Sequence, residues 1–584
     1  MKNPPTMEVS LKSPENSDQV FLSPIESLPY IKERDLLINI EFYFCTALSV
    51  FLWSYFTTSL GFHSYNSILK EKITSAFSYL SKFRDFQDAQ WKFFRTNSLY
   101  ILFFASIFLL ISKIIKKNSI EYTKIFYLVS GFFFTIYLVQ IKIIYLLFAG
   151  LCFYFTKNFV SFGAKGFVSI CWIELFLVRY VIYFIQSNIS IGNNLRIQKL
   201  SKIDDLSWNF ILVYSLLKML SYNIEYKKIF FKENESQPEG IFNLNQAKSH
   251  CMSCYDGNFC MKCLENTILD DKDKIDNSFN IINFLIYIFY PPLVGGGPLI
   301  NYNAFLFQLK ISKESEHNKL LKMNKLLYLL EIILIAALME VYNHFIYPIF
   351  LFKQNIFSLE DNSQFSLFYY CFLLINVLTF LWLKFAIIWK TFRLWAWCDG
   401  IIVEENMNRF VYDIYSIELL FRGLNRSLNR WIVRYIYIPL GGKNKKYVNI
   451  FAAFAFWYLI FDYSDIEYGI FCLICCILMD LEMFLINTFI NKFGEDYNDK
   501  IIIRYCKYLL CSVYLLIIFC ISLFGFHFSL NNMKIFADNI IEKGGYLYIL
   551  TFVLFFFPNV VMTFFIRDME LENAVSFQQK PKNY

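Results

Sequence analysis

Charged residues are scarce in this chain of 584 residues, since Asp, Glu, Lys and Arg together make up only 18%. A soluble protein typically carries charge at about a quarter of its residues, so an ordinary water-exposed surface is excluded. Hydrophobic residues reach 57% and aromatic residues 20%. Apolar surface on this scale requires lipid as its solvent. The composition therefore predicts an integral membrane protein.

The chain also lacks any block of basic residues interleaved with aromatic residues, which is a common footprint of nucleic-acid binding. Its net charge is +7. An excess of Lys and Arg is typical of loops beside membrane spans. We therefore expect membrane lipids as partners and no nucleic acid.

A cleavable signal peptide is a third absence. Residues 1–35 are polar and contain Pro and Ser, without a basic region followed by an apolar stretch and a cleavage site. We interpret them as a disordered tail. Targeting is then expected from the first span itself.

Long apolar runs are abundant. Runs of about 17 to 25 residues can cross a bilayer, and such runs begin near residues 36, 98, 122, 139, 165, 326, 366, 446, 466, 505 and 546. Two other segments do not form continuous apolar runs. Segment 281–305 is apolar but broken by prolines and three glycines, and segment 393–445 is dense in Arg, Asn and Trp. Irregular backbone at membrane depth is tolerated only where protein or a water-filled cavity surrounds it. We therefore expect these two segments to be re-entrant and to line a chamber.

These patterns divide the chain into five parts. A polar tail (1–35) precedes a transmembrane bundle (36–223) with an extramembrane segment at 61–97. A charged loop containing cysteines (224–278), a core (279–492), and C-terminal helices with a tail (493–584) follow.

Five blocks carry a family resemblance. They are DAQWKFFRTN (88–97), FYPPLVGGGPLINYNAF (289–305), MEVYNHFIY (339–347), AIIWKTFRLWAWCDGIIVEENMNR (386–409) and LNRSLNRWIVRYIYIPLGG (424–442). In this order they resemble blocks of the membrane-bound O-acyltransferase (MBOAT) family, in its glycerol uptake protein and hedgehog acyltransferase-like subgroup. The resemblance implies an all-α membrane fold, with about eleven transmembrane helices and re-entrant segments around a central chamber.

The resemblance also implies a reaction: transfer of an acyl group from acyl-CoA, the co-substrate, to a hydroxyl group in the membrane. The catalytic Asn of the family falls on Asn425, and Asn429 falls on a later His of the same motif. An Asn of this kind positions reactants and can stabilise developing charge. A helix cap or a bond to re-entrant backbone would also explain Asn425.

Histidine is scarce where the family needs it. The general base of the family is a His, but matching the aromatic residues and the following Asp puts Phe461 at its position, and a shifted register offers Tyr458. Phenylalanine cannot accept a proton. Three explanations stay open: a catalytically inactive pseudoenzyme, catalysis by orientation alone, or a displaced base.

His344 is the candidate for a displaced base. It follows Glu340 by four residues, so both lie on one helical face. An ionisable residue inside a membrane is a functional candidate by default. The alternative is a structural hydrogen bond between helices.

A cysteine cluster suggests a crosslink in the charged loop. Cys251, Cys254, Cys260 and Cys263 form two Cys-x-x-Cys pairs directly after His250. Four thiolates suit tetrahedral zinc, although the five-residue spacer is shorter than in common zinc ribbons. Two disulfides would be expected in an oxidising compartment, and free or palmitoylated thiols are the third alternative.

The charged block at 393–434 has two interpretations. Arginine forks suit the phosphates of CoA, and Arg430 and Arg434 are the candidate contacts, with Trp431 and Asn429 as further substrate-binding residues. The alternative for most of the block is a lattice of ion pairs beside the membrane.

The last five residues, 580–584, have Lys third and fifth from the end, which matches a dilysine retrieval signal and favours the endoplasmic reticulum membrane. In the resembling subgroup the implied role is remodelling of the lipid of glycosylphosphatidylinositol (GPI) anchors with a long-chain acyl-CoA. A pseudoenzyme that acts as a regulator or scaffold is the main alternative. A polyol transporter is less favoured, because the polar residues cluster in one block and do not spread along a pore.

Overall fold

A computed structural model describes most of the chain. The described residues are 40–52, 54–55, 88–117, 119–191, 205–231, 278–310, 325–346, 348–349, 367–407, 409–410, 414–462, 465–493, 501–526, 538 and 546–579. Across these ranges the regular structure is helical, and strand-like pairing is confined to one isolated bridge between Met407 and Leu424.

Five described stretches are long and apolar enough to cross a membrane. They are Ala89–Lys116, Ile120–Gln186, Lys325–His344, Ile375–Cys398 and Ile466–Leu485. Shorter apolar helices cover Ile40–Leu52 and Lys446–Phe461. The all-α membrane architecture expected from the sequence is confirmed, while the number of spans stays a prediction.

The outer surface of these helices is apolar. Helix α3 (Ala89–Lys116) buries Ile101, Phe108 and Ser112 on one face. On its other face Leu99 and Phe103 are 76% and 68% exposed. Exposed apolar side chains of this size need lipid around them.

Helix α3 begins earlier than the apolar run suggests. Asp88 caps it, since its carboxylate accepts a hydrogen bond from the backbone N–H of Trp91 at 2.6 Å. Its other oxygen lies 2.8 Å from the ammonium of Lys384, which is equally buried. The end of the segment expected outside the membrane, 88–97, therefore forms the cap and the first turns of a helix.

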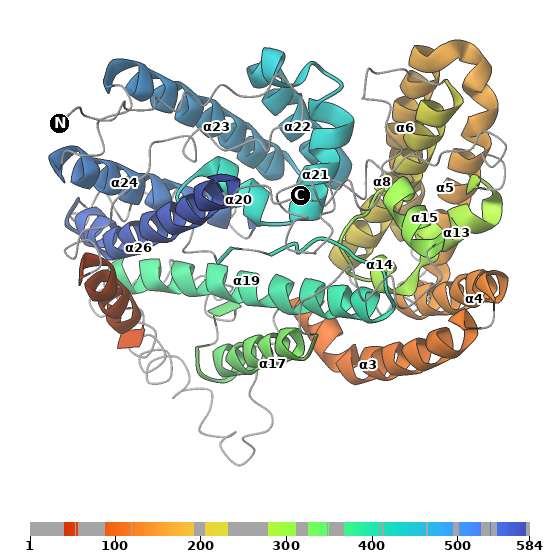
Figure 1. Cartoon of the computed structure of the whole chain (residues 1–584), viewed down its shortest axis with the longest axis horizontal. Helices are drawn as coiled ribbons and strands as arrows, with labels where there is room; N and C mark the ends of the chain where they lie inside the picture. The colour runs from red at the N-terminus through yellow and green to blue at the C-terminus, as the bar shows by residue number, and fades with distance from the viewer. Residues whose placement is uncertain are drawn as a thin grey trace, which may run out of the picture.

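The N-terminal half continues with α4 (Ile120–Val139), α5 (Ile143–Phe155), α6 (Gly163–Ile191) and α8 (Asp205–Phe230). In Figure 1 these helices gather on the right with α13 (Ile281–Phe289) and α15 (Tyr302–Lys310). Helix α8 is packed against α5, α6 and α13 and is buried almost throughout from residue 208 to residue 225. Its apolar run was not among the predicted spans.

The segment at 281–305 is broken as expected. Helix α13 ends at Phe289, α14 (Pro291–Val294) is a single turn that begins with proline, and the chain is extended before α15. Helix α13 lies directly on α4, because an added Cβ at Gly131 would lie 2.2 Å from the carbonyl oxygen of Phe289. This backbone contact fixes the re-entrant segment inside the protein.

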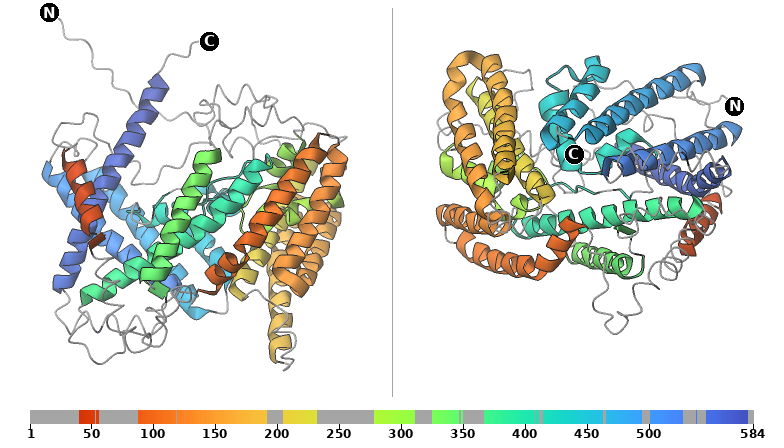
Figure 2. Two further views of the ribbon diagram at one scale, coloured as in Figure 1. Left: turned by 90° about the horizontal axis from the view of Figure 1, so that it is seen from below. Right: turned by 180° about the vertical axis from the view of Figure 1, so that it is seen from behind.

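The C-terminal half surrounds a long helix. Figure 2 shows α17 (Lys325–Val341, green), α19 (Leu367–Cys398, teal) and α3 (orange) side by side. The other helices of this half are α20 (Ile417–Gly423), α21 (Arg426–Ile432), α22 (Lys446–Phe461), α23 (Ile466–Phe493), α24 (Ile501–Phe526) and α26 (Tyr546–Gln579).

A buried carboxylate joins the two halves at the end of α19. Asp399 accepts hydrogen bonds from Ser112 of α3 and Tyr127 of α4, both at 2.5 Å. It also accepts from Tyr290, directly before α14, and pairs with Lys116 at 2.9 Å. Four donors from three segments thus meet on one side chain that is 2% exposed.

The chain after α19 is extended but not exposed. Ile401, Ile402 and Val403 are buried. The Gln308 side chain satisfies both backbone groups of Ile402. Its oxygen accepts from the N–H at 2.6 Å, and its amide donates to the carbonyl at 3.1 Å. Irregular backbone is thus satisfied by protein, as membrane depth requires.

Candidate functional site: a cavity between α20, α21, α22 and α23

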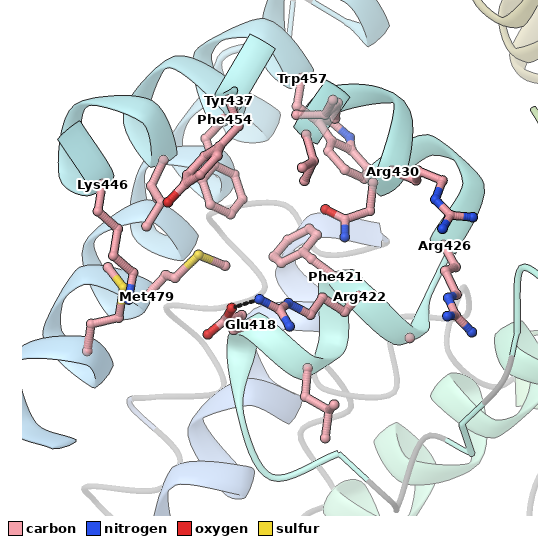
Figure 3. A pocket seen from close by; sticks show the side chains of 18 of the residues that line it. Glu418, Phe421, Arg422, Arg426, Arg430, Tyr437, Lys446, Phe454, Trp457 and Met479 are labelled. Atoms are coloured by element: carbon pink, nitrogen blue, oxygen red, sulfur yellow. Dashed lines mark ion pairs between the residues drawn. The ribbon is translucent and has the colours of Figure 1, made fainter. Parts of the chain in front are cut away.

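A cavity of about 440 Å³ lies between α20, α21, α22 and α23. Figure 3 shows side chains of these helices pointing into it. The π-helical turn η8 (Val433–Tyr437) and the extended chain near Glu404 and Arg409 complete its wall. The segment that the sequence marked as re-entrant, 393–445, thus forms one side of the cavity, and α22 and α23 form the other.

Helix α20 is held in place from α23. The Ser416 hydroxyl caps the helix by accepting from the N–H of Leu419 at 3.1 Å. Glu482 of α23 accepts from the N–H of Ile417 at 3.1 Å and from the Tyr514 hydroxyl of α24 at 2.9 Å. Two neighbouring spans therefore fix the helix that presents Glu418 and Arg422 to the cavity.

One part of the cavity wall is charged. Five cations line it against two carboxylates, an excess of three positive charges; the cations are Arg409, Arg422, Arg426, Arg430 and Lys446. Glu404 pairs with Arg426 at 2.7 Å through one oxygen and with Arg430 at 2.8 Å through the other. Glu418 pairs with Arg422, as the dashed line in Figure 3 marks. Such a rim suits an anion with several oxygens.

Most of the rest of the wall is apolar, apart from Asn429 and Tyr437. It is lined by Leu419, Phe421, Ile432, Val433, Ile450, Ala453, Phe454, Trp457, Met479 and Met483. Methionines adapt to flexible apolar ligands because their side chains are unbranched and polarisable. The cavity is therefore amphipathic, with charged and apolar side chains both in its wall.

The turn between η8 and α22 needs its two glycines. Gly441 and Gly442 have φ of +113° and +54°, a region that side chains disfavour. Asn449 fixes the turn by donating to the Gly442 carbonyl at 2.7 Å. At the start of the turn, burial and then the nearby Glu418 carboxylate raise the pKa of Tyr437, so its hydroxyl stays protonated. These contacts explain why the block ends in Pro-Leu-Gly-Gly.

Asn425 begins α21 in the left-handed region, with φ of 56° and ψ of 50°. Its carbonyl accepts from the N–H groups of Leu428 and Asn429 at 3.0 and 3.1 Å. Its side chain, in a residue only 8% exposed, donates to the Tyr214 hydroxyl of α8 at 2.6 Å. The side-chain oxygen has no hydrogen-bond partner within the described ranges. A buried acceptor left open in this way points to a ligand or a bound water.

A second, smaller cavity of about 70 Å³ reaches Tyr214 from the other side. Phe210 of α8, the backbone at Val294 to Gly297, and Phe385, Ile388 and Phe392 of α19 line it. Gly423 and Arg426, on either side of Asn425, line the larger cavity. Asn425 therefore lies between the two cavities.

Phe461 is the last residue of α22 and faces the same region. Its ring centroid is 5.6 Å from that of Phe210 and 5.8 Å from that of Trp457. Arg179 of α6 donates to its carbonyl oxygen at 3.2 Å. Tyr458, the alternative residue, packs against Gly469 of α23, where an added Cβ would lie 3.0 Å from its ring. Of the two residues considered for the missing His, Phe461 lies beside the aromatic residues that border both cavities.

Comparison with known proteins agrees with this arrangement. The model of the membrane-bound O-acyltransferase family matches residues 195–524, more than half of the chain. The chain belongs to the MBOAT family.

Relatives support the same subgroup. Membrane-bound O-acyltransferase GUP2 of Saccharomyces cerevisiae is 26% identical over 518 residues, which cover 85% of this chain and 80% of the relative. Membrane-bound O-acyltransferase GUP1 of the same yeast is 26% identical over 505 residues, 84% of each chain. Membrane-bound O-acyltransferase gup1 of Schizosaccharomyces pombe is 32% identical over 265 residues, 44% of this chain and 40% of the relative. The resemblance to the glycerol uptake protein subgroup of the MBOAT family is confirmed.

His344, the candidate for a displaced base in this MBOAT, lies elsewhere. It sits in the π-helical turn η5 (Tyr342–Ile346) after α17, with Nδ1 at 2.7 Å from the Glu340 carbonyl oxygen. The Glu340 carboxylate forms an ion pair with Arg95 of α3. His344 lines neither of the two cavities described above. The contacts of His344 with Glu340 lie within its own helix, and its role stays a prediction.

The predicted substrate contacts are divided. Asn429 and Arg430 line the larger cavity. Arg434, one turn later, pairs at 3.1 Å with Glu225 of α8, and Trp431 stacks on Phe456 behind the cavity wall. Arg434 and Trp431 do not line this cavity, so their role as substrate contacts stays a prediction.

Two predictions fall outside the described residues. One is the cysteine cluster of Cys251, Cys254, Cys260 and Cys263, and the other is the dilysine pattern at 580–584. In the part of the chain that the structure describes, no three His, Cys, Asp or Glu side chains are arranged to hold a metal. The zinc hypothesis has no support from the structure.

Sequence reasoning missed the contribution of α8. Tyr214 contacts Asn425, yet α8 was not recognised as a helix of its own. Part of the signal was present: polar residues recur at positions 214, 218, 221 and 225, although Ser215 and Asn223 also interrupt the apolar run. A spacing of four, three and four residues marks one face of a helix.

Proposed function

We propose that this protein transfers a long-chain acyl group from acyl-CoA to a hydroxyl group of a membrane lipid. The observation that carries the proposal is the amphipathic cavity, lined by five cations and by apolar side chains, whose wall includes Gly423 and Arg426 on either side of Asn425. Acyl-CoA has the same division, with phosphates at one end and an acyl chain at the other.

In this proposal the phosphates of CoA lie against Arg422, Arg426 and Arg430, whose guanidinium groups match phosphate geometry. The thioester and acyl chain extend along Phe454, Trp457 and the methionines of α23. Glu404 holds Arg426 and Arg430 one turn apart before the ligand arrives. A binding group held in place in advance loses less entropy when it binds.

Asn425 is the polar group at the inner end of this path. Its open side-chain oxygen can accept a hydrogen bond from the attacking hydroxyl, while its amide group stays fixed by Tyr214. This would hold the acceptor oxygen toward the thioester carbon. Orientation of two reactants can supply a large part of a catalytic effect.

For the acceptor we propose the lipid part of a GPI anchor, as the family subgroup implies. The terminal lysines Lys580 and Lys582 support residence in the endoplasmic reticulum membrane, where such lipids would meet acyl-CoA.

Phe461 favours one competing function. With phenylalanine at the position of the family's base, the same cavity could bind acyl-CoA without turnover, in a pseudoenzyme that regulates or supports another acyltransferase. The two functions share binding and differ in transfer.

Purified full-length protein supplied with radiolabelled palmitoyl-CoA and a panel of lysolipids, including a lyso-GPI lipid, separates them. The proposal predicts a labelled product with at least one acceptor. Binding of palmitoyl-CoA without any product would support the pseudoenzyme, and absence of binding would remove both functions.

A further inference from the structure

The smaller cavity lies between α3, α8, α19 and the re-entrant chain at 294–297. In the proposed function acyl-CoA occupies the larger cavity, which leaves the smaller one, of about 70 Å³, without a role. A buried water needs only about 10 to 15 Å³, and protein interiors contain few voids larger than a water molecule. A space of this size beside the candidate site therefore points to a ligand.

The shape and the wall of the smaller cavity suit a hydrocarbon chain. Six aromatic side chains without a hydroxyl line it: Phe93, Phe94, Phe210, Phe385, Trp389 and Phe392. The part of α19 in the wall runs from Phe385 to Phe392, which is about 10 Å of helix. A small volume drawn out over this length is narrow. It can take a single chain but has no room for a charged head group.

Glycines help to form this space. An added Cβ at Gly295 would lie 2.9 Å from Cδ1 of Leu138, and one at Gly296 would lie 2.9 Å from Cγ2 of Ile388. Leu138 and Ile388 both line the cavity. A side chain at either glycine would therefore force a lining residue to move.

One side of the smaller cavity adjoins the candidate reaction site. Tyr214 lines the cavity, and its hydroxyl accepts from the Asn425 amide at 2.6 Å. Among the described residues, the Tyr214 hydroxyl hydrogen has no acceptor and the Asn425 side-chain oxygen has no donor. A hydroxyl group placed here would thus find an open donor and an open acceptor within one hydrogen-bonded pair.

The cavity also reaches the surface between α3 and α19, which Figure 2 shows side by side. The lining residues Gln90 of α3, and Phe385 and Trp389 of α19, are only half-buried. Directly beside them, the ion pair between Asp88 and Lys384 joins the two helices at 2.8 Å. A membrane lipid could therefore reach Tyr214 by entering between these two helices.

We propose that the smaller cavity binds the hydrocarbon chain that the acceptor lipid already carries, with the acceptor hydroxyl held at Tyr214 and Asn425. This inference rests on the proposed function. The substrate class it names is a lipid with one chain and a free hydroxyl. The part of the chain nearest to the hydroxyl lies in the cavity, and the rest continues between α3 and α19 into the bilayer.

Filling the cavity tests this assignment. Ile388→Phe adds a ring to the wall of the cavity. In full-length protein supplied with palmitoyl-CoA and palmitoyl lysophosphatidylinositol, it should raise the KM for the acceptor at least about tenfold, the effect of losing about two buried methylene groups. Palmitoyl-CoA affinity should stay within twofold of wild type. Ile107→Phe, the same change on the exposed face of α3, is the matched control and should alter neither value. Ile211→Phe fills the same cavity from α8 if Ile388→Phe does not fold.

Photoaffinity labelling gives a readout that does not depend on transfer. Lysophosphatidylinositol with a diazirine in its chain should label α19 between Phe385 and Phe392, and Ile388→Phe should reduce this labelling at least threefold while Ile107→Phe leaves it unchanged. Labelling of wild type without any transfer would support the site and remove the proposed enzyme.

The contrary results are equally distinct. Transfer by wild type with the same acceptor KM and the same labelling in both filled variants would overturn this inference and leave the proposed function standing. A shift in the preferred chain length of acyl-CoA, with an unchanged acceptor KM, would also overturn it, because the donor chain would then lie in the smaller cavity. Absence of both labelling and transfer in wild type would overturn both proposals.

Discussion

Replacing Arg430 by glutamine should weaken acyl-CoA binding without unfolding the site. Arg430 lines the cavity, is 27% exposed and pairs with Glu404 at 2.8 Å. After Arg430→Gln, Glu404 keeps its bond to Arg426 at 2.7 Å, so no buried carboxylate is stranded. The effect should therefore appear in binding and leave the stability of the fold nearly unchanged.

The magnitude follows from one charged hydrogen bond. Bonds to charged groups contribute about 1.5 to 3 kcal/mol, and partial exposure at the rim favours the lower value. A loss of about 1.5 kcal/mol corresponds to an affinity about tenfold lower. Raising the salt concentration should narrow the difference in acyl-CoA affinity between variant and wild type, because salt screens exposed charges.

Equilibrium binding of a non-hydrolysable palmitoyl-CoA thioether measures this directly. Lys445→Gln is the matched control, because Lys445 is an exposed cation beside the cavity that does not line it. A dissociation constant for Arg430→Gln within twofold of wild type would refute the placement of CoA at the rim. An equal loss of affinity in Lys445→Gln would mean that the effect comes from general surface charge and not from a contact in the cavity.

Three further substitutions test the architecture by thermal unfolding in detergent. Asp399→Ala leaves Ser112, Lys116, Tyr127 and Tyr290 without their shared acceptor, and at about 1 to 1.5 kcal/mol for each donor it should cost about 4 to 6 kcal/mol; an unchanged unfolding temperature would contradict the network. Gly131→Ala places a methyl group against the Phe289 carbonyl and should cost at least about 1 to 3 kcal/mol, whereas Gly150→Ala inside α5, where the added Cβ would meet its nearest atom at an ordinary 3.7 Å, reports the helical backbone effect alone. Glu482→Ala removes the acceptor for Ile417 and Tyr514 and should cost about 1 to 3 kcal/mol, with Glu482→Gln much closer to wild type; equal losses in the two variants would argue for a packing effect.

The sequence was most informative where one physical pattern dominates. Apolar runs predicted the described stretches that are long and apolar enough to cross a membrane, because a helix must be apolar for its whole length to cross lipid. Prolines and glycines at 291–298 predicted the broken, buried segment, because irregular backbone has to be enclosed. The start of α3 was missed, because its boundary depends on the cap at Asp88 and on an ion pair with Lys384, nearly 300 residues away.

The functional site was harder to predict from the sequence than the fold. Motif resemblance led to Asn425 and to Phe461, but it could not separate Arg430, which lines the cavity, from Arg434, which Glu225 occupies. Partners of this kind come from helices distant in sequence. The contact of Tyr214 with Asn425 spans 211 residues, and no local pattern predicts it.

The most direct test of the account is a comparison of wild type with Asn425→Ala in transfer and in binding. Asn425 lies between two residues that line the larger cavity, Gly423 and Arg426, and its buried side-chain oxygen has no hydrogen-bond partner among the described residues. The account predicts transfer at least tenfold lower in the variant, with palmitoyl-CoA affinity within about twofold of wild type. Equal transfer by the two proteins would contradict the placement of the reaction at Asn425.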